Sequence, residues 1–190
     1  MHVRYERPVT AAACRSHDIW VLIDFVAYAG DCRVWGEFDL DGDRLSDALN
    51  ASETLLLRNA VLEGLDDGRL VEVDEVALDR SDLYVVAAHG PRGNSQRRIH
   101  TVPQRLEFLL GPYRVLGQVH GRPGLDSLAQ LTRRPAMVPI TNATIAYQIA
   151  GDLRVQDAGT IIINRDLAQE VRAADSFDRW AAKDYTWALE

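Results

Sequence analysis

The chain has 190 residues, of which 47% are hydrophobic, and a formal net charge of −7; it is long enough to bury a core in one large domain or two small ones. No apolar run approaches the roughly 18 residues of a membrane span, and the N-terminus lacks the apolar segment of a secretory signal. We therefore expect a cytoplasmic protein that has no membrane partner.

The charge is divided unevenly along the chain. Residues 1–88 hold 8 Arg and 18 Asp or Glu, whereas residues 89–190 hold 13 basic and 10 acidic residues. Opposite potentials on two connected modules indicate that the modules face each other, or that the acidic module of one molecule meets the basic module of the next.

In the first half, residues 19–29 and 32–39 predict two strands around Gly30-Asp31. Leucines at helical spacing predict a short helical turn over residues 44–50. Residues 54–63 and 69–78 then predict a hairpin across Asp66-Asp67-Gly68, and residues 83–88 a last short strand.

The second half follows the same order after a segment rich in Gly, Pro, Asn and Ser, residues 89–99, which we interpret as a linker. Strands are expected over residues 105–110 and 113–120, and a helical turn over residues 124–132. Apolar residues at spacings of three and four over residues 166–183 predict an amphipathic helix. This helix either caps an open sheet edge or contacts a partner, and its candidate contact residues are Phe177, Trp180 and, beyond it, Trp187.

Short motifs recur between the two halves. The segments that begin at Gly30 and Gly111 share four of seven residues at an offset of 81. Further matches follow at offset 83, where residues 57–62 align with residues 140–145, and at offset 85, where Asp79-Arg80 aligns with Asn164-Arg165. The sequence thus predicts a tandem duplication.

The predicted fold is mainly β with minor α: two tandem repeats of a small five-stranded bent sheet or barrel, followed by a C-terminal amphipathic helix. The predicted domains are an acidic module (residues 1–88), the linker (89–99), a basic module (100–172) and a helical extension (173–190).

The order of these motifs resembles the Sm-like small β-barrels. In that family a glycine bends the second strand, as Gly36 and Gly117 would do here, and the third strand has an apolar pattern that ends in Asp/Asn-Ala, like residues 55–60 and 138–143. The resemblance implies barrels that join edge to edge into rings, in which two fused copies supply two positions.

The chain departs from this family at the residues that hold RNA bases. Thr54 and Met137 replace the asparagine before the third strand, and the family's Arg-Gly pair becomes Arg80-Ser81 and Arg165-Asp166. These departures argue against the family's RNA pocket.

Few residues have a pattern that indicates catalysis or metal binding. Asp39, Asp41 and Asp43 are weak metal candidates, but their segment lacks the glycine and the final glutamate of a calcium loop, so we favour a solvated acidic turn. The five histidines show no ligand spacing, and two cysteines make no disulfide framework. No nucleophile motif is recognisable, and we predict a non-enzymatic protein without a cofactor.

Basic residues of the second half are the candidates for a nucleic-acid or partner surface, and ion pairs between the modules are the interpretation that we favour for them. These residues are Arg97, Arg98, Arg105, Arg122, Arg133 and Arg134. The leading functional hypothesis is a protein-interaction or assembly module that binds a protein partner or itself. The alternatives are RNA or single-stranded nucleic-acid binding through the basic module, and a small-molecule sensor that binds between the modules.

Overall fold

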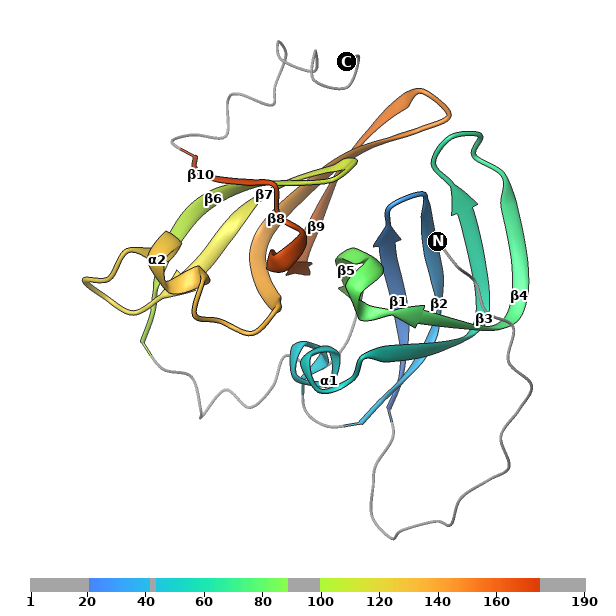
Figure 1. Cartoon of the computed structure of the whole chain (residues 1–190), viewed down its shortest axis with the longest axis horizontal. Coiled ribbons are helices and arrows are strands. Elements are labelled where there is room, and N and C mark those ends of the chain that lie inside the picture. The colour runs from blue at the N-terminus through green and yellow to red at the C-terminus, as the bar shows by residue number, and fades with distance from the viewer. Residues whose placement is uncertain (1–20, 42–43, 89–99, 175–190) are drawn as a thin grey trace, which may run out of the picture.

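One antiparallel sheet of ten strands forms the fold of the described residues, which are 21–41, 44–88 and 100–174 of a computed structural model (Figure 1). The strand order is β10-β6-β7-β8-β9-β5-β1-β2-β3-β4. The prediction of a mainly β protein with few helices is confirmed.

Each half contributes five strands, one short helix and a 3-10 turn. The first half contains β1 (Val21–Ala29), β2 (Cys32–Leu40), α1 (Leu45–Ala51), β3 (Thr54–Gly64), β4 (Leu70–Asp79), η1 (Arg80–Asp82) and β5 (Leu83–Ala88). The second contains β6 (Val102–Leu110), β7 (Tyr113–Gly121), α2 (Ser127–Leu131), β8 (Met137–Ile149), β9 (Asp152–Asn164), η3 (Arg165–Leu167) and β10 (Glu170–Ala173). Figure 1 shows the halves as two lobes, with β5 between them.

Strand pairing follows the same plan in both halves. β1 pairs with β2 and β5 just as β6 pairs with β7 and β10, and the pair Ala27–Val86 corresponds to Phe108–Val171. We call two residues counterparts when they hold the same place in the strand pairing of the two halves. The counterpart of β5 is thus β10, and the counterpart of β4 is β9.

The third strand of each half kinks at an asparagine. Asn59 and Asn142 have φ values of 49° and 48°, a left-handed conformation that asparagine tolerates better than most residues. Each lies beside a register shift in the pairing with the preceding strand, where Gly36 or Gly117 stands. A Cβ at Gly36 would lie 2.8 Å from the carbonyl oxygen of Arg58, so the close approach of the strands requires glycine there.

Two apolar clusters fill the interior, and each extends across the junction of the halves. The cluster of the first half includes Met137 and Ile162 from the second. The cluster of the second half includes Tyr28, Leu65 and Val85 from the first. The two halves therefore share their cores.

The predicted helix over residues 166–183 is wrong in its described part. Residues 165–167 form η3, and residues 170–173 form β10, which pairs with β6. The side chains of β10 alternate between the two faces of the sheet, as those of a strand do: Val171 packs on the core, whereas Arg172 binds Glu107 on the opposite face. The linker at 89–99 and the helical extension beyond residue 174 lie outside the described residues.

Candidate functional site

The junction between the halves is built on strand pairing. Residues 85–87 of β5 pair with residues 161–163 of β9. Val85, Val86 and Ile163 are fully buried there. Aliphatic side chains cover both faces of this pairing and keep water away from it. Burial of apolar surface stabilises a fold by about 25 cal/mol per Å², so this joint is a main source of the stability between the halves.

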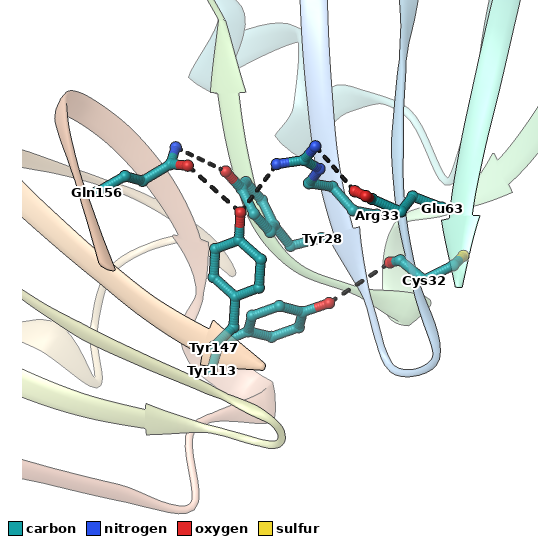
Figure 2. Close-up of polar contacts among 7 residues, drawn as sticks. All are labelled: Tyr28, Cys32, Arg33, Glu63, Tyr113, Tyr147 and Gln156. Carbon is teal, nitrogen blue, oxygen red and sulfur yellow. Dashed lines mark hydrogen bonds and ion pairs between the residues drawn. The ribbon is translucent and has the colours of Figure 1, made fainter. Parts of the chain in front are cut away.

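A polar cluster lies on one face of this joint (Figure 2). Arg33 Nη1 donates to the hydroxyl of Tyr147 at 2.9 Å, and that hydroxyl donates to Gln156 Oε1 at 3.3 Å. Gln156 Nε2 donates to the hydroxyl of Tyr28 at 3.0 Å. Arg33 also pairs with Glu63, with 2.8 Å between Nη2 and Oε2. Side chains of both halves thus bind one another at a partly buried site.

Three tyrosine rings pack together beneath these polar contacts. The Tyr28 and Tyr147 rings meet nearly edge to face with centroids 5.4 Å apart, and Tyr113 lies 5.5 Å from Tyr28 and 5.9 Å from Tyr147. Burial raises the pKa of Tyr28 to about 12 and raises that of Tyr113 as well. Both phenols therefore stay neutral at physiological pH, which suits a structural contact rather than proton transfer.

Asparagine side chains bind the main chain across the joint. Asn50 at the end of α1 donates from Nδ2 to the carbonyl of Met137 at 2.9 Å and accepts from the N–H of Met137 at 3.0 Å. Asn164 Nδ2 donates to the carbonyl of Arg80 at 3.2 Å. These amide groups complete the hydrogen bonding of strand ends that would otherwise lie unpaired in the joint.

Two strand edges of the described sheet stay open. Within that part of the chain, β4 pairs with β3 alone and β10 with β6 alone. β4 carries Glu72, Asp74, Glu75 and Asp79 and no basic residue, and its Leu70 and Val71 side chains are exposed. Open edges present unpaired N–H and C=O groups to other strands.

A cavity of about 230 Å³ lies beside the β10 edge, lined by Glu107, Leu109, Arg114, Glu170 and Arg172. Arg172 Nε lies 2.6 Å from Glu107 Oε2, and Arg114 Nε bonds the other oxygen of this carboxylate. Burial acts to raise the pKa of Glu107, but the hydrogen bonds and charges of Arg172 and Arg114 outweigh it, and the pKa is lowered.

Three of the six basic residues predicted from sequence lie around α2. Arg122 and Arg133 are exposed beside α2, and Arg134 is half-buried and donates to the carbonyl of His120. Arg105 lies on β6, facing Gln118 of β7. Arg97 and Arg98 lie outside the described residues, as do Phe177, Trp180 and Trp187.

The described ion pairs lie within the halves rather than between them. Arg33 pairs with Glu63 and Arg58 with Asp39 in the first half, and Arg114 pairs with Glu107 in the second. Within the described ranges, the contacts that join the halves are strand pairing, aliphatic packing and the tyrosine cluster, and the ion pairs predicted between the modules are not among them.

Two of the three weak metal candidates of the acidic turn lie in the described residues. Asp39 is held by Arg58, Asp41 is exposed, and Asp43 lies outside the described residues. No group of three or more His, Cys, Asp or Glu in the described ranges could hold a metal ion.

Two arginines that recur in the sequence, Arg80 and Arg165, bind backbone carbonyls. Arg80 Nη1 donates to the carbonyl of Asn50 at 3.0 Å, and Arg165 Nη1 donates to the carbonyl of Thr132 at 2.8 Å. Each binds a carbonyl at the C-terminal end of its half's short helix.

The tyrosine cluster was missed by sequence reasoning. Tyr147 aligns with Gly64 and Gln156 aligns with Val71, so neither belongs to a repeated motif. The one signal was Arg33, which recurs as Arg114 in the segments that begin at Gly30 and Gly111.

No helix in the described ranges is long and apolar enough to cross a membrane. The chain matches no protein-family model, no curated protein and no solved structure. Nothing in these comparisons indicates an enzyme.

Proposed function

We propose that this chain is a non-catalytic assembly module made of two copies of one small β unit, which joins further copies of itself through the β4 and β10 edges. The pairing of β5 with β9 carries the proposal. β5 and β9 are the counterparts of β10 and β4, so the chain already contains one example of the contact that its two open edges would make. A contact of this kind joins different surfaces head to tail and propagates into a ring or filament.

The internal joint sets the expected register between copies. Val86 pairs with Ile162 in the chain, and their counterparts are Val171 on β10 and Ala77 on β4. We therefore expect Val171 to lie opposite Ala77 of a second copy. Ala77 is exposed in the single chain, so its side chain is available for this contact.

The charges and side chains of the β4 and β10 edges are compatible with pairing between two copies of the chain. In the register of the internal joint, Arg172 of β10 would lie opposite Val76, next to Glu75 of the acidic β4. The polar pair Tyr28–Gln156 of the internal joint would become the apolar pair Leu109–Val71 between copies. In each joint the two paired side chains thus match each other in polarity, as complementary surfaces require.

The joint between copies should nevertheless be weaker than the internal one. The counterparts of Val85 and Ala87 are Glu170 and Arg172, whose side chains are 58% and 50% exposed. Charged residues on a strand edge oppose tight apolar pairing, because burying them costs free energy. The proposal is thus a reversible assembly that depends on salt.

Disulfide trapping tests the register directly. Ala77→Cys combined with Val171→Cys, in a Cys14→Ser background, should form intermolecular disulfides and a ladder of covalent oligomers, because directly opposite residues have Cβ atoms about 4.5–5.5 Å apart. Each single variant can form at most a dimer and is the matched control. Cys32 is buried and does not interfere.

Light scattering after size exclusion tests assembly of the unmodified chain. We expect mass to rise with protein concentration and fall at high salt. Ala77→Lys should abolish the rise, whereas Leu22→Lys, at an exposed position of β1 away from both edges, should not. A monomer at all concentrations, together with no ladder from the double-cysteine chain, would exclude self-assembly through these edges.

A further inference from the structure

We infer that an ion pair between Arg133 of one copy and Asp79 of the next closes the joint between copies and makes assembly depend on salt. This inference rests on the assembly proposed above and names the contact that regulates it. Two asparagines close one end of the internal joint, and this arginine and this aspartate hold the corresponding places on the open edges.

Asn50 and Asn164 lie at the same end of the internal joint. Asn50 binds the main chain of Met137, and Met137 pairs with Asn164 where β8 meets β9. Both asparagines also contact Arg80: its guanidinium donates to the carbonyl of Asn50 at 3.0 Å, and its own carbonyl accepts from Asn164 Nδ2 at 3.2 Å. Two neutral amides, each able to donate and accept, therefore close this end of the joint.

Between copies, Asp79 of β4 takes the place of Asn164. Asp79 pairs with Thr54 at the end of β4, just as Asn164 pairs with Met137 at the end of β9. Asp79 is exposed in the single chain, and its Oδ1 accepts from the Thr54 hydroxyl at 3.1 Å. An ionised carboxylate has no proton to donate, so Asp79 cannot repeat the bond from Asn164 to a carbonyl. It requires a donor from the other copy instead.

The segments that follow the two short helices correspond at an offset of 83. The backbone N–H of Arg80 donates to the carbonyl of Glu53 at 2.7 Å, and that of Arg165 donates to the carbonyl of Ala136 at 2.9 Å. Because Arg80 aligns with Arg165, Glu53 and Ala136 hold the same place in the two halves. The third strand of each half begins at the next residue.

At this offset Arg133 holds the place of Asn50. Asn50 reaches the end of β8 and β9 in the other half, so Arg133 should reach the Thr54–Asp79 end of β3 and β4 in the next copy. Arg133 is exposed, and within the described ranges neither Arg133 nor Asp79 has an ion pair. Each thus meets the other copy with a charge that is still hydrated.

The two exchanges preserve complementarity because they occur on both sides of the joint. The internal joint has an amide on each side, whereas the joint between copies has a guanidinium on one side and a carboxylate on the other. A guanidinium binds a carboxylate through as many as two parallel hydrogen bonds. Dissolved salt screens an ion pair at the rim of a joint, with a Debye length of about 8 Å at physiological ionic strength. The pair therefore strengthens assembly at low salt and weakens it at high salt.

Charge reversal on each side tests the pair. Asp79→Arg places two arginines opposite each other in every joint, and Arg133→Asp places two aspartates there, so each variant alone should assemble at least about tenfold more weakly than the parent. An equimolar mixture of the two variants restores an arginine opposite an aspartate in every joint. The mixture should therefore assemble at concentrations close to those of the parent, as measured by size exclusion with light scattering.

Asp24→Arg is the matched control. It makes the same change in net charge as Asp79→Arg, but at an exposed position of β1, which lies inside the sheet. It should assemble as the parent does, which separates the local effect from that of net charge. Urea unfolding of each variant checks that the exposed substitutions leave the fold intact, since such changes usually alter stability by less than about 0.5 kcal/mol.

Salt dependence gives a second measurement. Arg133→Gln removes the charge but keeps an amide, which is the group that Asn50 supplies in the internal joint. Its assembly should be weaker than that of the parent at low salt and should change less between roughly 0.05 and 0.5 M NaCl, because one screened pair is missing from each joint. An unchanged salt dependence would contradict the assigned pair.

Failure of the ion pair and failure of edge assembly give different results. If the chain with Ala77→Cys and Val171→Cys forms a ladder, but both charge reversals assemble like the parent or their mixture assembles no better than either alone, the ion pair is excluded and edge pairing stands. If that chain forms no ladder and the parent stays a monomer, edge assembly and the ion pair are excluded together.

Discussion

Removing the hydroxyl of Tyr147 measures how much the polar cluster stabilises the joint between the halves. The Tyr147 side chain is 1% exposed, and its hydroxyl accepts from Arg33 and donates to Gln156. Tyr147→Phe removes both hydrogen bonds. A hydrogen bond to a charged group contributes about 1.5–3 kcal/mol and a neutral one about 0.5–1.5 kcal/mol. Because Arg33 is 24% exposed, water replaces part of its lost acceptor, and we expect a loss of about 2 kcal/mol.

Urea unfolding followed by circular dichroism gives the free energy of unfolding for each variant. In thermal unfolding, a loss of this size should lower Tm by about 4–8 °C for a chain of this length. The control is Tyr84→Phe, which removes a hydroxyl for which no hydrogen bond is found in the described ranges, and should cost less than about 0.5 kcal/mol. Equal losses in the two variants would refute the reasoning, because the Tyr147 contacts would then contribute nothing to the joint.

Three further changes test other parts of the fold. Gly36→Ala should cost about 1–3 kcal/mol in urea unfolding, since the new Cβ would lie 2.8 Å from a backbone carbonyl. The lowered pKa of Glu107 means that its ionised form stabilises the fold above the unfolded pKa of 4.5 and that this contribution is lost as pH falls through the lower folded value. Glu107→Gln should therefore be less stable than the parent at neutral pH, and the difference should shrink in unfolding curves recorded at acidic pH. Burial raises the pKa of Cys32 to about 12, so in a Cys14→Ser chain a thiol reagent at pH about 8 should react only after urea unfolding; rapid reaction in the native state would contradict the buried position.

Local patterns in the sequence were sufficient for most of the strands. The predicted hairpins around Gly30-Asp31 and across Asp66-Asp67-Gly68 form with ends within a few residues of those expected. This succeeded because turn residues and alternating apolar residues act within one hairpin, without help from the rest of the chain.

The C-terminal part of the second half shows where such patterns fail. Leu167, Val171 and Ala174 recur at spacings of four and three, which favoured a helix, yet Val171 lies in a strand. Short apolar segments satisfy both periods, and the partner strand decides between them. Val171 is the counterpart of Val86, which lies in a strand of the first half, so the plan shared by the halves favours the strand.

The tyrosine cluster depends on contacts that no local pattern contains. Tyr28 and Gln156 are 128 residues apart and meet only because β5 pairs with β9. The charge difference between the halves predicted that they face each other through ion pairs, but charge acts at long range and does not determine which strands pair.

The equivalent face of the sheet is apolar in the first half and charged in the second. In the first half it carries Val26, Tyr28 and Val85 and is buried by the second half. In the second half the counterparts are Glu107, Leu109 and Glu170, and the face is charged and hollow. A dry face needs a permanent cover, because exposing it costs free energy, whereas a charged face is stable in water and can be covered and uncovered. The chain therefore covers this face of the first half within one molecule, and under the proposed assembly the charged face of the second half would make the reversible contact.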